Sequence, residues 1–407
     1  MTVPMRLCAG LLGCMLWFGA GCTTSTAPAV DVTSLTPAER EARHLTDVVQ
    51  LTFSRDFDRA GEAYFSKDMR WLVFQAVPKG ERSYQMYVAR VVYREGHPVG
   101  LVAVTRVSPP ASSNTCGWFA DDDRTLIFAS TAGKHDPDEP APGYQREGRD
   151  YRWMFSPGMD IYVVPDWQRQ VFAAAEGYVN LARPEYRVTD NDHYDAECAA
   201  SPDGRWIVFC SDRPSEIDPQ WADSPAATRP GVRHRQLYVL DRRSGETVQL
   251  TATAGYNGGP FFSADGRKLV YRSDRVGNNL LQVYVADVVR DRRGRITGLR
   301  NEQPITSDAN VNWGPFFSPD GRWVYYASSK VSQANYEVFA RRTTPDRPLP
   351  ADGSAGERGE TRITFAPGPD VLPVISPDGR LMVWSSRRGN DPTTQIYVAR
   401  LTPPDGR

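Results

Sequence analysis

The chain alternates short apolar runs with turns of the type Ser-Pro-Asp-Gly-Arg. The clearest copy is Phe317–Arg322, which is followed by the apolar run Trp323–Ser329. Pro319 presets the backbone angle φ for a turn, Asp320 can accept hydrogen bonds from its own backbone, and Gly321 tolerates a positive φ. Aromatic and β-branched residues on both flanks favour a pleated sheet. The pattern therefore predicts a strand, a tight turn and a second strand.

This hairpin pattern occurs six times in one register. The aligned positions, at the serine of the turn or its equivalent, are Ser66, Ala120, Ser201, Ser263, Ser318 and Ser376. An apolar second strand follows each position, and then a third strand with a central aromatic residue, as in Gln282–Ala286. A fourth strand precedes the next hairpin, as in Gln303–Thr306. Each unit thus predicts four antiparallel strands.

Six such units predict an all-β fold, a six-bladed β-propeller. The last unit ends after its third strand, near Leu401, and Val48–Thr52 can supply the missing fourth strand. Pairing these two segments would close the ring and remove an exposed sheet edge. We therefore expect one closed domain over residues 45–402 and a tail over residues 403–407.

The hairpin Phe-Ser-Pro-Asp-Gly-Arg with its two following strands resembles the WD40-like PD40 repeat of the TolB family. The resemblance implies a propeller of the bacterial periplasm, where TolB proteins act with the peptidoglycan-associated lipoprotein. TolB also has an N-terminal α/β domain, for which the segment before this propeller is too short, so the resemblance does not carry that partner over. The copies Lys67-Asp68-Met69 and Asp121-Asp122-Asp123 lack the Pro and the Gly, and we expect their turns to differ in shape.

The first residues indicate an export signal. Arg6 precedes the mostly apolar run Leu7–Ala20, which is shorter than the ~20 residues of a membrane-spanning helix. Cys22 follows small residues, and the arrangement resembles a bacterial lipoprotein signal, in which the cysteine is lipidated. Gly19 departs from the leucine that such signals prefer, and plain cleavage is the alternative. We expect residues 1–21 to be the signal peptide and Cys22 to carry the lipid.

Residues 22–44 are predicted to tether the propeller to that lipid. They begin rich in Thr, Ser, Pro and Ala, and Thr36 followed by Pro37 predicts one or two turns of helix. A lipid anchor holds a protein at a membrane surface without spanning the bilayer. We therefore expect a periplasmic monomer anchored to a membrane, with the outer membrane preferred.

Composition and charge narrow the range of partners. The chain is 40% hydrophobic and 24% charged with a formal net charge of −1, which gives no reason to expect a nucleic-acid partner. Three of the six cysteines lie in the signal, and Cys116, Cys198 and Cys210 remain. We expect these to be small buried thiols, although a disulfide stays open in an exported protein.

In a propeller the first strand of each blade lines a central channel, and the loops that lead into it form a rim, the default binding site. Five units carry Asn or Asp six residues before the aligned position: Asn114, Asp195, Asn257, Asn312 and Asp370. These side chains predict local backbone bonding, a ring of ligand contacts, or both. Glu62 and Glu197 are expected to face the channel, and His193 and Trp313 stand in or beside the same loops.

A metal site is a weaker candidate in these loops. The residues Asp190, Asp192, Asp195 and Glu197 could offer Ca²⁺ several hard oxygens, but their spacing does not match an EF-hand, and a solvated acidic rim is the alternative. We predict no cofactor, and we regard His193 as a weak catalytic candidate. The long insertions over residues 131–156 and 214–235 should emerge on one face as surface loops, or as a lid or partner contact.

The sequence offers little for catalysis. It has no Gly-x-Ser-x-Gly elbow and no zinc-type His or Cys pair, and no residues remain for a separate hydrolase domain. We therefore predict a non-catalytic cell-envelope binding or scaffold protein whose rim and channel bind a protein, peptide or glycan. A carbohydrate-active lyase or hydrolase that uses the channel carboxylates is the alternative, although lyases of this repeat class use several channel histidines with a metal.

Overall fold

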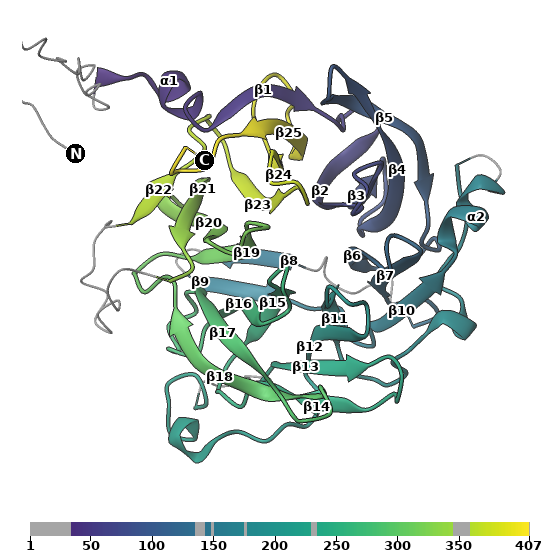
Figure 1. The fold of residues 1–407 in the computed structure, drawn as a ribbon, viewed down its shortest axis with the longest axis vertical. Coiled ribbons are helices and arrows are strands. Elements are labelled where there is room, and N and C mark those ends of the chain that lie inside the picture. Colours follow the sequence, from purple (N-terminus) through teal and green to yellow (C-terminus); the bar gives the residue numbers. More distant parts are fainter. Residues whose placement is uncertain are drawn as a thin grey trace, which may run out of the picture. The chain divides into compact units, whose positions relative to one another are not determined.

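Six antiparallel sheets stand around a common centre in the computed structural model (Figure 1). The structure describes residues 34–134, 143–147, 150–174, 177–228, 234–344 and 359–406, and those from Thr36 onward form one compact unit. The predicted six-bladed propeller is confirmed. The signal peptide and the lipidation site Cys22 lie outside the described residues and stay predictions.

Each blade begins with its innermost strand. Blade 1 consists of β2 (Phe57–Phe65), β3 (Trp71–Pro78), β4 (Gln85–Arg94) and β5 (His97–Arg106). Blade 2 consists of β6 (Asn114–Ala120), β7 (Thr125–Ser130) and β10 (Asp160–Pro165). Blade 3 consists of β11 (Asp195–Ala200), β12 (Trp206–Ser211), β13 (Gln236–Asp241) and β14 (Thr247–Gln249).

The remaining blades follow the same order. Blade 4 consists of β15 (Asn257–Phe262), β16 (Lys268–Ser273), β17 (Gln282–Arg290) and β18 (Ile296–Pro304). Blade 5 consists of β19 (Asn312–Phe317), β20 (Trp323–Ser332), β21 (Asn335–Arg342) and β22 (Glu360–Arg362). Blade 6 consists of β23 (Asp370–Ile375), β24 (Leu381–Ser386), β25 (Gln395–Leu401) and β1 (Leu45–Gln50).

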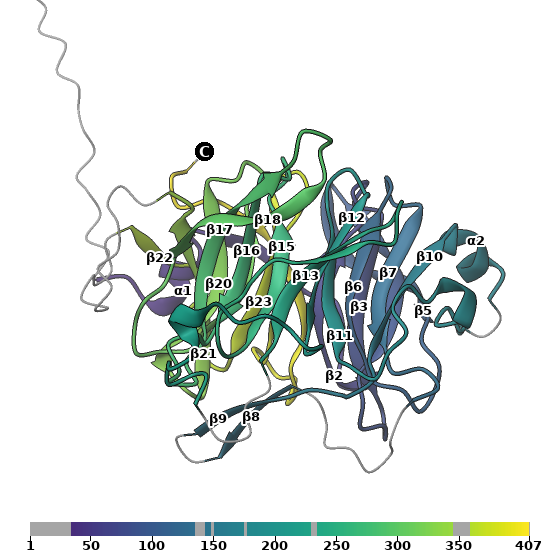
Figure 2. The ribbon, with the colours of Figure 1, turned by 90° about the horizontal axis from the view of Figure 1, so that it is seen from below.

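Blade 2 departs from the predicted four strands. Its expected fourth strand is reduced to one bridge between Tyr162 and Arg187. Short helices flank that segment: α2 (Trp167–Phe172) and η2 (Pro184–Tyr186), with η3 (Pro219–Trp221) in the later insertion. The hairpin of β8 (Gly143–Glu147) and β9 (Asp150–Met154) belongs to the insertion over residues 131–156 and lies across one face of the ring (Figures 1 and 2).

The ring closes as predicted, because β1 pairs antiparallel with β25 from Leu45 opposite Leu401 to Gln50 opposite Tyr397. The predicted short helix is α1 (Pro37–Glu41), and the Thr36 side chain caps it. We expected all of residues 22–44 to form a tether, and this is corrected for the helix α1 near the end of that range. Glu41 pairs with Arg388 of blade 6 at 2.6 Å, so the helix is docked on the propeller.

The hydrophobic core lies between neighbouring blades. The strands β7, β12 and β24 are buried along their whole lengths, because each sheet is covered by a blade on either side. This burial explains why the second strands are continuous apolar runs rather than alternating ones. No helix in the described ranges is long and apolar enough to cross a bilayer.

The repeated serine is a structural joint of the hairpin. In blade 5, Ser318 donates from Oγ to Asp320 Oδ1 and accepts from the backbone N of Trp323 at 2.9 Å. The first hairpin has the same bonds although it lacks Pro and Gly, because Met69 takes the positive φ, 59°, that glycine adopts elsewhere. Our expectation of a different shape is therefore wrong for that turn. It is confirmed for Asp121-Asp122-Asp123, where all three residues have positive φ.

Candidate binding site

The predicted rim asparagines lie in the seams between blades. Asn257 donates from Nδ2 to Oε1 of Gln236, on the third strand of the preceding blade, at 3.2 Å. The same contact joins Asn114 to Gln85 at 3.1 Å and Asn312 to Gln282 at 3.0 Å. All three asparagines are at most 2% exposed. The predicted backbone bonding is present as well, but these side chains mainly fasten one blade to the next.

Aspartate at the same position uses an arginine instead. Asp195 accepts from Arg213 at 2.7 Å, and Asp370 accepts from Arg388 at 2.8 Å. Both aspartates are fully buried. All five predicted residues are therefore buried, the asparagines in the seams and the aspartates against arginines of their own blades, and too little of their surface remains for a ligand on the rim.

Every first strand has an irregular residue four positions before the aligned site. The six residues are Glu62, Cys116, Glu197, Gly259, Gly314 and Leu372, and their φ values lie between 48° and 58°. A β-bulge accompanies each of them, as between Ala196 and Ala199 in β11. Left-handed backbone is costly for residues other than glycine, and it concentrates at functional sites. The predicted channel-facing glutamates are two members of this bulge ring.

Neighbouring groups donate four hydrogen bonds or charged contacts to the carboxylate of Glu197. Its carboxylate accepts from the hydroxyls of Tyr194 at 3.0 Å and Tyr256 at 2.7 Å, from the backbone N of Gly259 at 2.6 Å and from Arg272 Nη2 at 2.9 Å. A side chain at Gly259 would place its Cβ 2.5 Å from Arg272 Nη1, so glycine there makes room for the guanidinium. The ion pair is buried on both sides.

Glu62 occupies the equivalent position in blade 1. It accepts from the Tyr64 hydroxyl at 3.1 Å and from the Cys116 thiol at 3.0 Å. Burial raises the pKa of Glu62, while the Cys116 hydrogen bond and the Arg272 charge lower it. Burial also raises the pKa of the Cys116 thiol, and the nearby Glu62 charge adds to that effect. A cavity of about 20 Å³ borders both glutamates, which is room for about one water molecule.

Four aromatic rings close the channel between the bulge ring and the face that carries the six turns. They stand two residues before the aligned site, at Tyr64, Trp118, Phe261 and Phe316. Every pairing of these four rings is a contact, with centroids 5.2–6.4 Å apart. We call this group the aromatic collar. It separates the glutamates from the face that carries the six turns, the hairpin face.

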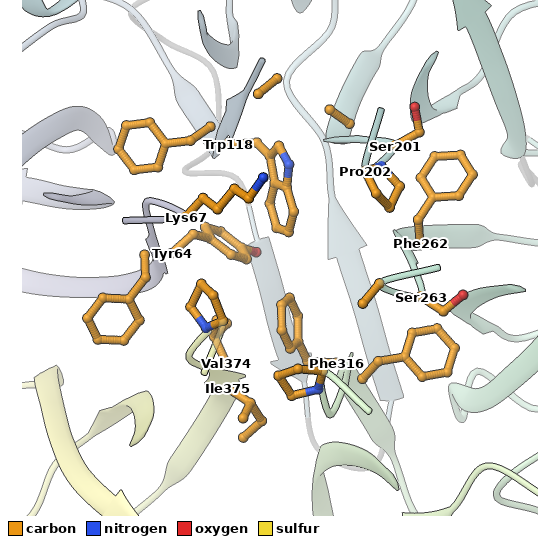
Figure 3. Close-up of a pocket in the computed structure, with 18 of the residues that line it drawn as sticks. Tyr64, Lys67, Trp118, Ser201, Pro202, Phe262, Ser263, Phe316, Val374 and Ile375 are labelled. Carbon is orange, nitrogen blue, oxygen red and sulfur yellow. The ribbon is translucent and has the colours of Figure 1, made fainter. Parts of the chain in front are cut away.

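A funnel of about 360 Å³ opens above the collar on the hairpin face. Tyr64, Trp118 and Phe316 lie at its floor, and Lys67 reaches over its edge (Figure 3). The walls are the turns themselves and include Pro202, Pro319 and Pro377. Lys67 pairs with Asp122 at 2.5 Å, and both side chains are exposed. This funnel therefore lies on the face opposite the loops that we predicted to form the binding rim.

The predicted loop residues lie on the other face. His193 is 39% exposed at its side chain, and its Nδ1 lies 3.7 Å from Asp212. Trp313 is partly buried, with its ring 6.5 Å from that of Tyr336. From the long insertion, Phe155 packs on Tyr194 and Tyr256 at 5.0 and 5.1 Å, beside Glu197.

The four acidic residues suggested for calcium do not gather. Asp190 pairs with Arg187 at 2.7 Å, Asp192 is exposed, and the other two are bound to the arginines described above. In the part of the chain that the structure describes, no group of three or more His, Cys, Asp or Glu side chains could hold a metal ion. The cysteines Cys116, Cys198 and Cys210 are free and buried, as predicted.

The sequence interpretation missed the collar and Arg272. The collar had a visible signal, because an aromatic residue recurs two positions before the aligned site in four of six units. Arg272 had none, because it lies on the second strand of blade 4 and reaches Glu197 of blade 3 only in the folded ring.

Comparison with known proteins adds little beyond the architecture. No protein-family model matches the chain. A curated relative, an uncharacterised protein of Agrobacterium fabrum, is 30% identical over 181 residues, which are 44% of this chain and 50% of the relative. The chain thus spans about half the length of the curated relative that it matches.

Two TolB structures are among the similar solved structures, as the repeat predicted. A protein assigned as TolB from Agrobacterium tumefaciens is 17% identical, over 84% of this chain and 90% of that chain, with a TM-score of 0.44. TolB from Acinetobacter baumannii is 15% identical, over 85% and 64%, with a TM-score of 0.45. An oligogalacturonate lyase from Vibrio parahaemolyticus is 12% identical, over 89% and 97%, with a TM-score of 0.45. At sequence identities and TM-scores this low, these structural similarities do not indicate a function.

Proposed function

We propose that this chain is a non-catalytic binding protein of the cell envelope, and that its funnel receives an apolar segment of a protein or peptide. The aromatic collar carries the proposal, because it turns a channel into a recess with an apolar floor. The volume of about 360 Å³ lies within the ~300–1,000 Å³ of ordinary ligand pockets. Partly exposed aromatic rings at the centre of a recess are the usual anchors of a protein interface.

The chemistry of the funnel wall favours an apolar segment over a polar small molecule. The serines that line it, Ser201, Ser263 and Ser318, each donate to the aspartate of their own turn. Their hydroxyls are therefore occupied, and prolines and aromatic rings supply much of the apolar part of the wall. Lys67 and the three aspartates Asp121, Asp122 and Asp123 form a polar side of the funnel, which would orient the segment.

A lyase or hydrolase is the second candidate. One observation favours it: the pKa of Glu62 is raised by burial, and Glu62 has left-handed backbone, both of which are common among catalytic residues. The arrangement around it opposes this reading, because the collar covers Glu62 on the hairpin face and Glu197 is held by Arg272 and two tyrosines. Turnover of a glycan by the wild type, abolished in Glu62→Gln or Glu197→Gln, would replace the binding proposal.

Anchoring at the membrane is part of the proposal and rests on the sequence. Cys22 after the apolar run supports lipidation, and residues 23–35 would connect the lipid to the docked helix α1. Fractionation of cells that express the wild type and Cys22→Ala tests this. We expect Cys22→Ala to leave the membrane fraction, and unchanged retention would contradict lipidation at that residue.

Affinity capture from envelope extract tests the funnel. The bait is the exported chain, and Phe316→Ala is the variant that removes part of the floor. Phe172→Ala is the matched control, because Phe172 is an aromatic residue that is 66% exposed on α2, outside the funnel. We expect a protein that is captured by the wild type and by Phe172→Ala to be lost from Phe316→Ala. Equal capture by all three baits would contradict the proposal.

A further inference from the structure

A second cavity lies between blades 5 and 6 on the hairpin face. It has a volume of about 490 Å³ and meets the funnel at a shared wall that includes Pro319 and Ile375. Leu401, Thr402 and Pro403 close its outer side. We call it the blade 5–6 cavity. Because the funnel has its own floor, the two recesses are separate sites.

The chain end is held beside this cavity. Asp405, two residues beyond Pro403, pairs with Arg322 at 3.0 Å, and its other carboxylate oxygen, Oδ1, is buried without a hydrogen-bond partner in the described part of the chain. The C-terminal segment is thus latched to the blade 5 hairpin.

Tyr325 is the residue at which this cavity departs from the repeat. It stands seven residues after the aligned serine of blade 5. The other five blades hold a buried β-branched residue there: Val73, Ile127, Val208, Val270 and Val383. The repeat therefore provides five internal controls, and none of them needs a hydroxyl at this position.

The hydroxyl of Tyr325 is unpartnered within the part of the chain that the structure describes, although, besides burial, the Asp320 and Asp405 charges are near enough to raise its pKa. Its side chain is 0% exposed, and no described residue makes a hydrogen bond with its oxygen. A buried hydroxyl without a partner is destabilising, and valine would fill the core as it does elsewhere. Local departures of this kind without a structural gain are expected at functional positions. Tyr325 lies in the wall of the cavity, so the missing partner belongs there.

The polar groups around the cavity are mixed in character. Asp378 uses Oδ1 for Ser376 and the backbone N of Arg380, which leaves Oδ2 without a hydrogen bond among the described residues. The Arg380 side chain is exposed and makes no ion pair or hydrogen bond with the residues that the structure describes. Asp320 also lines the cavity and is paired with Arg322 at 2.6 Å, so acidic and basic groups both stand at the wall. Burial raises the pKa of Tyr325, so its hydroxyl stays protonated and can donate.

We propose that the blade 5–6 cavity is a binding site for a neutral, hydroxyl-rich ring molecule, a saccharide, with the Tyr325 hydroxyl as its buried polar contact. Ligand hydroxyls both donate and accept, which matches a wall that offers donors and acceptors together. The apolar faces of a sugar ring match Trp323 and Leu401. The volume of about 490 Å³ is within the range of small-ligand pockets.

Three variants of the whole exported chain test this site. Tyr325→Phe removes only the hydroxyl, and Tyr325→Val installs the residue type of the other blades. Tyr326→Phe is the matched control, because the neighbouring hydroxyl is already bonded to Glu360. The probes are the free disaccharides maltose, cellobiose and diacetylchitobiose, measured by saturation-transfer NMR and calorimetry, with thermal melting of each variant without sugar.

We expect at least one disaccharide to bind the wild type and Tyr326→Phe, and to bind Tyr325→Phe about tenfold more weakly or not at all. Without sugar, Tyr325→Phe should melt at the wild-type temperature or higher, since no internal bond is lost. Three results would overturn the proposal: no disaccharide of the panel binds, Tyr325→Phe binds as well as the wild type, or sugar-free Tyr325→Phe melts at a lower temperature. The funnel proposal is independent, because these variants leave the collar intact.

Discussion

The rings of Trp118 and Phe316 meet across the channel from opposite blades, with their centroids 6.2 Å apart. This contact divides the channel into two parts with different chemistry. On the hairpin face it provides the floor of a funnel, and on the other side it encloses Glu62 and Glu197 with a cavity for about one water. A ligand in the funnel therefore meets aromatic surface rather than carboxylates.

Loss of charge at the two channel glutamates should reduce the free energy of unfolding by very different amounts. Glu197→Gln leaves the buried Arg272 without its ionic partner and should lower the free energy of unfolding by about 3–5 kcal/mol. Glu62→Gln should cost less, about 1 kcal/mol, because Glu62 accepts hydrogen bonds from the Tyr64 hydroxyl and the Cys116 thiol rather than from a guanidinium. Urea unfolding of the two variants checks this, and equal losses would contradict the assigned environments.

Glu337 should make the propeller less stable as the pH rises. Burial raises its pKa from 4.5 to about 7, with Asp370 adding to that shift. The folded state thus holds this proton more tightly than the unfolded chain. The stabilising contribution is complete below pH 4.5 and is lost as the pH rises to about 7. At about 1.4 kcal/mol for each pKa unit, the loss is roughly 3 kcal/mol.

The variant Glu337→Gln removes this pH dependence. Glutamine is the residue at this position in four other blades, so the fold accepts it: Gln85, Gln236, Gln282 and Gln395. We expect the unfolding free energy of Glu337→Gln to fall less than that of the wild type between pH 4.5 and 7. The exposed control Glu246→Gln should keep the wild-type slope. If the unfolding free energy of Glu337→Gln depends on pH as steeply as that of the wild type, another group is responsible for the pH dependence.

The fold could be predicted from the sequence because six copies of one pattern repeat the same signal. The fixed spacing of Pro, Gly and the apolar runs locates all six hairpins in the sequence, even where one copy departs from the Ser-Pro-Asp-Gly-Arg motif. Met69 shows the limit of reading one copy, because a non-glycine residue adopts the left-handed φ of the turn. The shape of this turn follows from the Ser66 hydrogen bonds that it shares with the other hairpins, and not from the conformational preference of Met69.

The site was only partly predictable. Glu62 and Glu197 face the channel as expected, since side chains of the first strands must surround its axis. The seam role of Asn257 could not be read locally, because its partner Gln236 belongs to the preceding blade. The predicted binding rim lies on the other face, and the funnel was not predicted because its floor consists of aromatic residues, such as Trp118, that resemble ordinary core in the sequence.

The docked N-terminal helix should contribute to stability. Glu41 is nearly buried against Arg388 and also accepts from the backbone N of Phe365 at 2.6 Å. Removing one charged hydrogen-bonding partner costs about 1.5–3 kcal/mol, so Glu41→Gln should lower the unfolding free energy by that amount. Glu39→Gln, in the exposed cap of the same helix, is the control and should lower the unfolding free energy clearly less than Glu41→Gln. A neutral Glu41→Gln would mean that the helix is not docked in solution.

The three propeller cysteines should be unreactive in the folded protein. Burial raises the pKa of Cys198 to about 12 and raises that of Cys116 and Cys210 well above the usual value. Thiolates are therefore scarce at neutral pH, and the side chains are covered. Iodoacetamide followed by peptide mapping should label these positions only after denaturation. Rapid labelling of the native chain would contradict the enclosed channel.

Site-specific photocrosslinking tests the central proposal most directly. A photoreactive amino acid replaces Lys67 at the funnel edge, and in a second chain it replaces Phe172 on the outer surface. Cells that export each chain are illuminated, and adducts are identified by mass spectrometry. We expect one protein or peptide to crosslink from position 67, to be absent from position 172, and to disappear when Trp118→Ala is added. The same adduct from both positions, or an adduct from position 67 that persists in Trp118→Ala, would contradict binding in the funnel.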